Sequence, residues 1–325
     1  MAKVAFEDLS GASTPVTSNP YDGLIQATGN DTKTLQESYQ LHRETRNRQQ
    51  KAKILSDDFS GWILDEHLVK LDGHQRDDDY VDPRNCLVFW GRPPGKVKQL
   101  IHIIQQKLKD AAPDIWLMPL DRLHITAMEV THSKTAEEID RLVNVLKPNF
   151  QLIADYPSLH RARLIKPMIS YDAAALALSF VPAAGENPGR GRKVEEDDYT
   201  YHHLRRDLYT LITKAGVEVG SRYVVPSAHL TIARFNSKNP FGDDPLDASA
   251  GLDMKKRKHW ISEIEMINKW LEAEYWPDRS GHEGEGIMPG GEFIPGEEKG
   301  LDFRKGRLWY GGGETVYLGK GHHLS

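Results

Sequence analysis

The chain has 325 residues, of which 39% are hydrophobic and 27% charged, an ordinary composition for a globular protein large enough to bury a substantial core. Its formal net charge of −5 argues against a surface that holds long nucleic acid by charge alone, but it is compatible with a small phosphate-bearing substrate in a local basic cleft. The single cysteine, Cys86, excludes an internal disulfide and fits an intracellular location. We find no apolar run that fits a signal peptide or a membrane span.

Residues 1–84 are expected to form an N-terminal extension that is partly disordered and then helical. Residues 1–30 are rich in Gly, Ser, Thr, Asn and Pro, which predicts a loose lead-in. A helix is expected from about Asp31, a candidate N-cap, to Lys53. Its apolar stripe is thin, so this helix is expected to lie on the surface or to cover a cleft.

Residues 85–325 are expected to form the main domain, with one lobe over about 85–150 and a second over about 160–325. The first lobe opens with a buried-strand pattern at 85–90, followed by a helix whose apolar residues recur at helical spacing from Val97 to Leu108. Thr135 and Glu138 then form a capping box that opens another helix.

The second lobe repeats this order. A strand region is expected over 164–181, a helix over 201–215 with Gly216 at its C-terminal end, and a further helix that carries Trp260 to Leu271. A final strand or hairpin is expected over 308–318. The fold class is therefore α+β, with strands and helices in the same order in each half.

One short pattern occurs twice, at equivalent points of the two halves. Its copies are Leu123–Met128 and Ala228–Ala233, and each contains a His-x-Thr tripeptide within an apolar strand pattern. Successive side chains of a strand point to opposite faces, so the histidine and threonine of each copy share one face. A single tripeptide is weak evidence, and two amphipathic strands with a solvated polar face would explain it. Repetition at matching places of a duplicated unit favours a shared function.

Two imidazoles that face each other across a cleft suit in-line displacement at phosphorus. One group must remove a proton from the nucleophile while the other gives a proton to the leaving oxygen, and the ordinary pKa of histidine, about 6.5, suits both roles. His124 and His229 are therefore the candidate catalytic residues. Thr126 and Thr231 can donate hydrogen bonds to the non-bridging phosphate oxygens. Protons and hydroxyl groups cover this chemistry, so we expect no cofactor and no metal.

The paired His-x-Thr strands resemble the 2H phosphoesterase superfamily. Within it, the segments at 82–87 and 225–235 are similar to fungal RNA ligase/cyclic nucleotide phosphodiesterase-like proteins, and the resemblance covers about residues 82–320. It implies a bilobal fold in which two antiparallel sheets face a central cleft, with helices outside. It also implies metal-independent hydrolysis or ligation at 2′,3′-cyclic or 2′,5′-linked phosphates of nucleotides or RNA ends, with the two histidines as acid and base and the two threonines as phosphate ligands.

Three further residues are candidates for binding the substrate. Arg234 is five positions after His229, so in a regular strand it faces away, and only a bulge or the end of the strand would bring it to the phosphate. Tyr223 and Trp90 could stack on a base, although buried aromatic residues more often belong to a core. Trp116 has the same two interpretations.

Weaker signals concern a loop, a basic run and two histidine pairs. The loop with Arg190, Arg192 and Lys193 could close over phosphates or be an ordinary solvated loop. The basic run at 255–258 is compatible with nuclear import or with plain surface charge. The pairs at 202–203 and 322–323 lack the spacing of a metal site.

Three hypotheses follow from the sequence. The first is a metal-independent phosphodiesterase, or a related 2′,5′ RNA ligase, whose partner is a nucleotide or RNA-end substrate. The second is a module that binds nucleotides or RNA ends without turnover. The third is a scaffold whose N-terminal helices recruit a partner. We expect a monomer in the cytoplasm, with a nuclear location left open, and no membrane contact.

Overall fold

The protein is a mixed α+β chain built on two four-stranded antiparallel sheets. The structure, a computed structural model, describes residues 7–188, 192–221, 224–242, 244, 246–277 and 287–322. The strands are β1 (Asn85–Gly91), β2 (Trp116–Leu117), β3 (Ile125–Lys134), β4 (Leu164–Tyr171), β5 (Ala175–Pro182), β6 (Ala228–Arg234), β7 (Leu301–Gly306) and β8 (Glu314–Leu318). The α-helices are α1 (Asp22–Ala27), α2 (Thr32–Ile54), α3 (Glu66–Asp72), α4 (Gly95–Ala111), α5 (Ala136–Leu146), α6 (Phe150–Ala154), α7 (Tyr156–Leu159), α8 (Tyr201–Lys214), α9 (Ala248–Gly251) and α10 (Met254–Tyr275).

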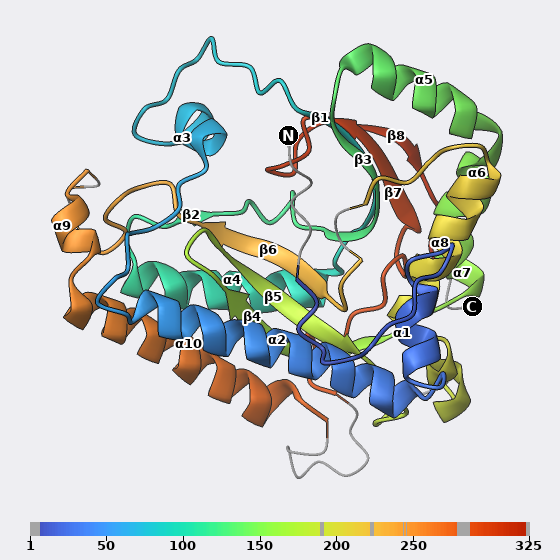
Figure 1. The fold of residues 1–325 in the computed structure, drawn as a ribbon, viewed down its shortest axis with the longest axis horizontal. Helices are drawn as coiled ribbons and strands as arrows, with labels where there is room; N and C mark the ends of the chain where they lie inside the picture. The colour runs from blue at the N-terminus through green and yellow to red at the C-terminus, as the bar shows by residue number, and fades with distance from the viewer. Residues whose placement is uncertain are drawn as a thin grey trace.

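The first sheet has the strand order β3-β1-β7-β8, and the second has the order β2-β6-β5-β4. One His-x-Thr motif is thus associated with each sheet: Thr126 lies in β3, which begins directly after His124, and both His229 and Thr231 lie in β6. Helices α5, α6 and α8 pack against the first sheet, and α2, α4 and α10 pack against the second. Figure 1 shows α2 and α10 running beside the second sheet, and α5, α6 and α8 grouped near the first.

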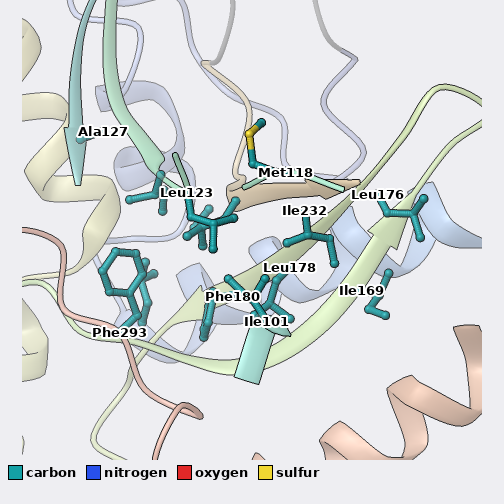
Figure 2. Packing of buried hydrophobic residues seen from close by; sticks show 14 of the residues in the cluster. Ile101, Met118, Leu123, Ala127, Ile169, Leu176, Leu178, Phe180, Ile232 and Phe293 are labelled. Atoms are coloured by element: carbon teal, nitrogen blue, oxygen red, sulfur yellow. The ribbon is translucent and has the colours of Figure 1, made fainter. Parts of the chain in front are cut away.

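One apolar core joins the two sheets. It includes Phe89 and Phe303 of the first sheet, whose rings stack with centroids 4.3 Å apart, and Leu178 and Ile232 of the second. Figure 2 shows residues of the second sheet packed with Leu123, which precedes β3. Because both sheets bury apolar side chains in the same cluster, their mutual position is set by core packing.

Several predicted elements are confirmed with small shifts at their ends. The capping box of Thr135 and Glu138 is present at the start of α5, and Asp31 caps α2 by accepting a hydrogen bond from the Thr34 amide. Gly216 follows α8 with a φ of 91°, a left-handed conformation that favours glycine. The hairpin expected over 308–318 differs, because its strands are β7 and β8 and residues 307–313 form the connection.

The predicted lobe boundaries need correction. Strands β7 and β8 lie within the expected second lobe, yet β7 pairs with β1 and extends the first sheet. Strand β2 lies within the expected first lobe, yet it pairs with β6 of the second sheet. Hydrophobic periodicity identifies strands but not their partners, because pairing is decided by tertiary packing.

The N-terminal segment also differs from the expectation of a loose lead-in. Tyr21 and Leu24 are buried in the core, and the Asn19 side-chain amide donates to the Arg206 carbonyl oxygen at 2.8 Å. Residues 1–6 lie outside the described part of the chain. Residues 19–54 therefore belong to the packed fold.

Helix α2 is fastened to the edge strand β4 by a polar side chain. The Asn47 amide donates to the Ile169 carbonyl oxygen at 2.8 Å and accepts from the Tyr171 amide at 3.2 Å. Asn268 of α10 bonds both backbone groups of Ile169. Because an edge strand otherwise exposes unpaired backbone groups, these amides both cover the edge and fix the helix.

We predict that Asn47→Ala lowers the free energy of unfolding by about 1–3 kcal/mol, the usual cost of leaving partly buried backbone groups without their partner. Gln49→Ala is the control, since Gln49 is an exposed residue of the same helix. Urea unfolding of both variants checks the prediction. Equal stability of the two variants would contradict the docking role of Asn47.

Candidate active site

His124 is held between its own loop and the first sheet. Its ring stacks on Trp90 of β1, with centroids 3.7 Å apart and an interplanar angle of 16°. The Arg92 and Arg304 guanidinium groups lie 4.8 and 5.1 Å from the centre of the same indole. Trp90 is 1% exposed, so its role here is to support the imidazole. Stacking of Trp90 on a substrate base would require this packing to open.

His229 and Thr231 project from one face of β6. They pair with Ser179 and Ala177 of β5, which are two residues apart and so share a face. The Nδ1 atom of His229 lies 2.9 Å from the Ser227 hydroxyl oxygen. The local geometry matches the alternation that the sequence predicts.

The structure brings both His-x-Thr motifs to one cavity. We call the pair of histidines, His124 and His229, the dyad, and we call this space the dyad cavity. Its volume is about 70 Å³. It is lined by Cys86, Val88, Trp90, Met118, His124, Thr126, Glu129, His229, Thr231, Arg234, Leu308 and Trp309. Histidines 105 residues apart in the sequence thus face a single space between the two sheets.

A β-bulge brings Arg234 to this cavity. Ala177 pairs with Thr231 but the next pair is Leu176 with Ala233, so Ile232 is an extra residue in β6. One extra residue reverses the alternation of faces, and Arg234 consequently lies on the face of His229. The bulge was one of the two conditions under which the sequence allowed Arg234 to reach the site. Among the described residues, no acceptor bonds the Arg234 guanidinium, and its Nε atom is buried.

A second bulge does the same for Glu129. Trp90 pairs with Thr126 but Phe89 pairs with Met128, so Ala127 is an extra residue in β3. Glu129 therefore shares a face with Thr126, although a regular strand would separate them. Glu129 follows His124 by five positions, as Arg234 follows His229. This matching offset could have identified Glu129 from the sequence.

Helix α8 anchors the motif strand β3 and the segment that leads into β6. The Tyr201 hydroxyl donates to the Thr126 carbonyl oxygen at 3.1 Å, and Arg205 donates from Nη1 to the Val225 carbonyl oxygen at 3.0 Å. These two donors are one helical turn apart. Arg205 is also held by Tyr21, whose ring centre lies 4.6 Å from the guanidinium carbon. The helix thus fixes the positions of the segments that carry the two His-x-Thr motifs relative to each other.

The hydrogen bond of His124 defines its neutral tautomer. Its Nδ1 atom lies 2.8 Å from the Arg122 carbonyl oxygen, which can only accept, so Nδ1 carries a proton. In the neutral ring Nε2 then holds the lone pair that a general base needs. Burial and the nearby positive charge of Arg92 lower the pKa of His124 to about 3, against the raising effect of the Arg122 hydrogen bond.

The environment of His229 acts in the same direction. Burial, together with the positive charges of Arg46, Arg205 and Arg234, lowers its pKa to about 4. Both imidazoles are therefore neutral at neutral pH in the ligand-free protein. The surrounding guanidinium groups favour an anion in the cavity.

A larger cavity adjoins the dyad cavity, and we call it the side chamber. Its volume is about 240 Å³, and it shares His229, Thr231, Arg234 and Trp309 with the dyad cavity. Together the two spaces lie at the lower end of the range typical of small-molecule sites, about 300–1,000 Å³. The chamber floor includes the small side chains of β5, and α2 of the N-terminal extension forms one wall.

Trp309 is the aromatic residue at the junction of the two cavities. It is half-buried, and the Arg84 guanidinium carbon lies 4.5 Å from its ring centre. Sequence reasoning missed Trp309 because it lies in the connection between β7 and β8, where no periodic pattern marks it. Tyr223, proposed as a stacking residue, lies outside the described residues. Trp116 is buried and donates to Asp72 at 2.8 Å, away from both cavities.

The weaker sequence candidates that lie in the described part of the chain are not among the residues that line these cavities. Arg192 is bonded to Asp197 at 3.0 Å, and Arg190 lies outside the described residues. Arg257, within the basic run at 255–258, is buried and donates to the Ser56 carbonyl oxygen at 3.0 Å. His202 bonds the Tyr39 hydroxyl group at 2.9 Å. His203 lies 2.8 Å from the Thr200 hydroxyl oxygen.

Within the described ranges, no three His, Cys, Asp or Glu side chains are grouped so that they could hold a metal ion. The same part of the chain has no helix with both the length and the apolar character needed to cross a membrane. A scan against protein-family models gives no match to this chain, and a comparison with curated proteins gives no significant match.

We predict that the protein loses stability as the pH falls from about 6.5 to 5. Five histidines, of which His124 and His229 are half-buried and the others buried, have a native pKa far below the ordinary value of 6.5, namely His42, His124, His202, His203 and His229. In this pH window the unfolded chain binds protons that the native state excludes, so the free energy of unfolding decreases.

Urea unfolding at pH 7.5, 6.5, 5.5 and 5.0 measures this slope. A chain with both His124→Asn and His229→Asn should show a shallower slope, because two of the groups that take up protons on unfolding are gone. A free energy of unfolding that stays constant over this range would contradict the neutral state of these histidines.

Proposed function

We propose that this chain is a metal-independent phosphodiesterase with a bilobal 2H-type fold, acting on a 2′,3′-cyclic phosphate or a 2′,5′-linked nucleotide or RNA end. The observation that carries the proposal is the meeting of both His-x-Thr motifs and Arg234 in one small cavity between the sheets. Binding alone would not need two imidazoles at one phosphate, whereas displacement at phosphorus needs both an acid and a base.

His124 is assigned as the general base. Its Nδ1 proton is committed to the Arg122 carbonyl oxygen, so the neutral ring offers Nε2 to the nucleophile. Water gives a proton to Nε2 and its oxygen forms the new bond to phosphorus. Thr126 and Thr231 donate to the non-bridging oxygens, and Arg234 adds a positive charge beside them.

His229 is assigned as the general acid. Its proton passes to the 2′ or 3′ oxygen of the ribose as the bond from that oxygen to phosphorus breaks. The low pKa of the ligand-free ring reflects burial and the positive charges around it, and a bound phosphate anion offsets those charges. Substrate binding is therefore expected to raise the pKa of His229, so that its ring takes up the proton that a general acid needs. In the ligase alternative, a ribose hydroxyl group replaces water as the nucleophile.

We predict that the purified chain converts a nucleoside 2′,3′-cyclic phosphate to a monophosphate in excess chelator. His124→Ala and His229→Ala should each lower kcat/KM by about 10²–10⁴-fold, the usual contribution of a positioned acid or base. His102→Ala is the control, since His102 is an exposed residue of α4. Product analysis by chromatography gives the rates.

The pH dependence of kcat/KM separates the two roles. Loss of the base should remove the limb on which activity rises with pH, and loss of the acid should remove the limb on which it falls. Tight nucleotide binding without any product, from cyclic or 2′,5′-linked substrates, would instead favour the non-catalytic binding module. Ligated RNA as the main product would favour the ligase.

A further inference from the structure

The side chamber is lined by a cation that lies beside the turn between β4 and β5. Arg46 of α2 lines the chamber together with Asp172, the residue with which it forms an ion pair. Asp172 belongs to the turn between β4 and β5, where its other carboxylate oxygen accepts from the Ala174 and Ala175 amides at 2.8 and 2.9 Å. The turn thus fixes the carboxylate, and the carboxylate aims the guanidinium group.

Arg46 keeps donors that the fold does not use. Only its Nη2 atom is bonded to Asp172, and no other acceptor for its guanidinium occurs among the described residues. Arg43, one turn earlier on α2, is by contrast bonded to Gln40 and to the Lys166 and Ser179 carbonyl oxygens. The Arg46 and Asp172 side chains are 33% and 27% exposed, a setting in which an ion pair contributes little to stability. A guanidinium with spare N–H groups in a cavity is suited to a phosphate.

The position of Arg46 relates it to the dyad. Ser179 pairs with His229 and Ala175 pairs with Arg234, so the Asp172 turn lies four residues along β5 from the point opposite His229. Arg46 lines the side chamber but is not among the residues that line the dyad cavity. A ligand that reaches Arg46 from the dyad cavity must therefore extend into the side chamber. The positive charge of Arg46 contributes to the lowered pKa of His229, which agrees with their facing the same chamber.

We propose that Arg46, on the N-terminal helix α2, binds a second phosphate of the substrate, on the 5′ side of the nucleoside whose cyclic phosphate occupies the dyad cavity. This inference rests on the proposed function for the location of the reacting phosphate. It assigns the N-terminal extension a part in substrate choice, because α2 supplies a wall of the chamber and, in Arg46, a guanidinium with unused donors. Arg46 is a binding residue here and takes no part in proton transfer.

The test uses three substrates that differ in the group on the 5′ oxygen: adenosine 2′,3′-cyclic phosphate, its 5′-phosphorylated form, and a dinucleotide with the same cyclic end. The wild-type chain should prefer a phosphate-bearing substrate over the plain one by about tenfold in kcat/KM, the scale of one charge-assisted hydrogen bond. Preference for the 5′-monoester identifies a free nucleotide as the substrate, and preference for the dinucleotide identifies an RNA end.

The matched variants are Arg46→Gln and Arg48→Gln. Arg48 is an exposed residue of the same helix, so its variant should keep the preference, whereas Arg46→Gln should reduce it to about twofold or less. The informative quantity is the ratio of kcat/KM for a phosphate-bearing substrate to kcat/KM for the plain one. Any change in the pKa of His229 caused by Arg46→Gln affects all three substrates alike and cancels in this ratio. Equal preferences in the three proteins would overturn the inference.

Calorimetric binding of the reaction products keeps the inference separate from the proposed function. The ligands are adenosine 2′-phosphate, adenosine 3′-phosphate and their 5′-phosphorylated bisphosphate forms, measured with the same three proteins. A chain that turns over the plain cyclic nucleotide but shows no 5′-phosphate preference in rate or binding retains the proposed function and refutes the role of Arg46. A chain without turnover refutes the proposed function, and the bisphosphate preference and its loss in Arg46→Gln then still decide the inference.

Discussion

The set of charged side chains that face the dyad cavity depends on one extra residue in each motif strand. Ala127 in β3 and Ile232 in β6 are the bulge residues, and each reverses the alternation of faces immediately after the motif threonine. Without these bulges, Glu129 and Arg234 would point away from the histidines. With them, an acidic and a basic side chain face the same cavity from equivalent positions of the two halves. The same kind of bulge thus occurs once in each motif strand, and it turns an acidic residue of β3 and a basic residue of β6 towards the cavity.

The electrostatic character of the site is opposite to that of the whole chain. The chain has a net charge of −5, yet Arg43, Arg46 and Arg234 line the side chamber, and burial together with nearby positive charges keeps both imidazoles neutral. Such a site favours the binding of an anion, whose negative charge would balance the positive charge of these guanidinium groups. The neutral state of the rings also leaves a lone pair for a base, while the acid depends on the ligand to gain its proton.

The sequence predicted the motifs and most elements but not how the elements combine. His124, Thr126, His229 and Thr231 were identified because alternation within a strand is a local property. The sheet to which β2, β7 and β8 belong is decided by tertiary pairing, which leaves no periodic signal. Trp309 was missed for the same reason. The contribution of α2 could have been inferred in part, since Tyr39, Arg43 and Arg46 recur at helical spacing in place of an apolar stripe.

The central claim is that both imidazoles contact one phosphate. A crystal structure of the protein with bound vanadate, which adopts the trigonal-bipyramidal geometry of in-line displacement, tests it most directly. The account predicts one vanadate in the dyad cavity, with the ring nitrogens of His124 and His229 within hydrogen-bond distance of oxygens on opposite sides of the metal and with Thr126 and Thr231 on its equatorial oxygens. Vanadate bound to only one histidine, or bound elsewhere with the dyad cavity closed by its own side chains, would contradict it.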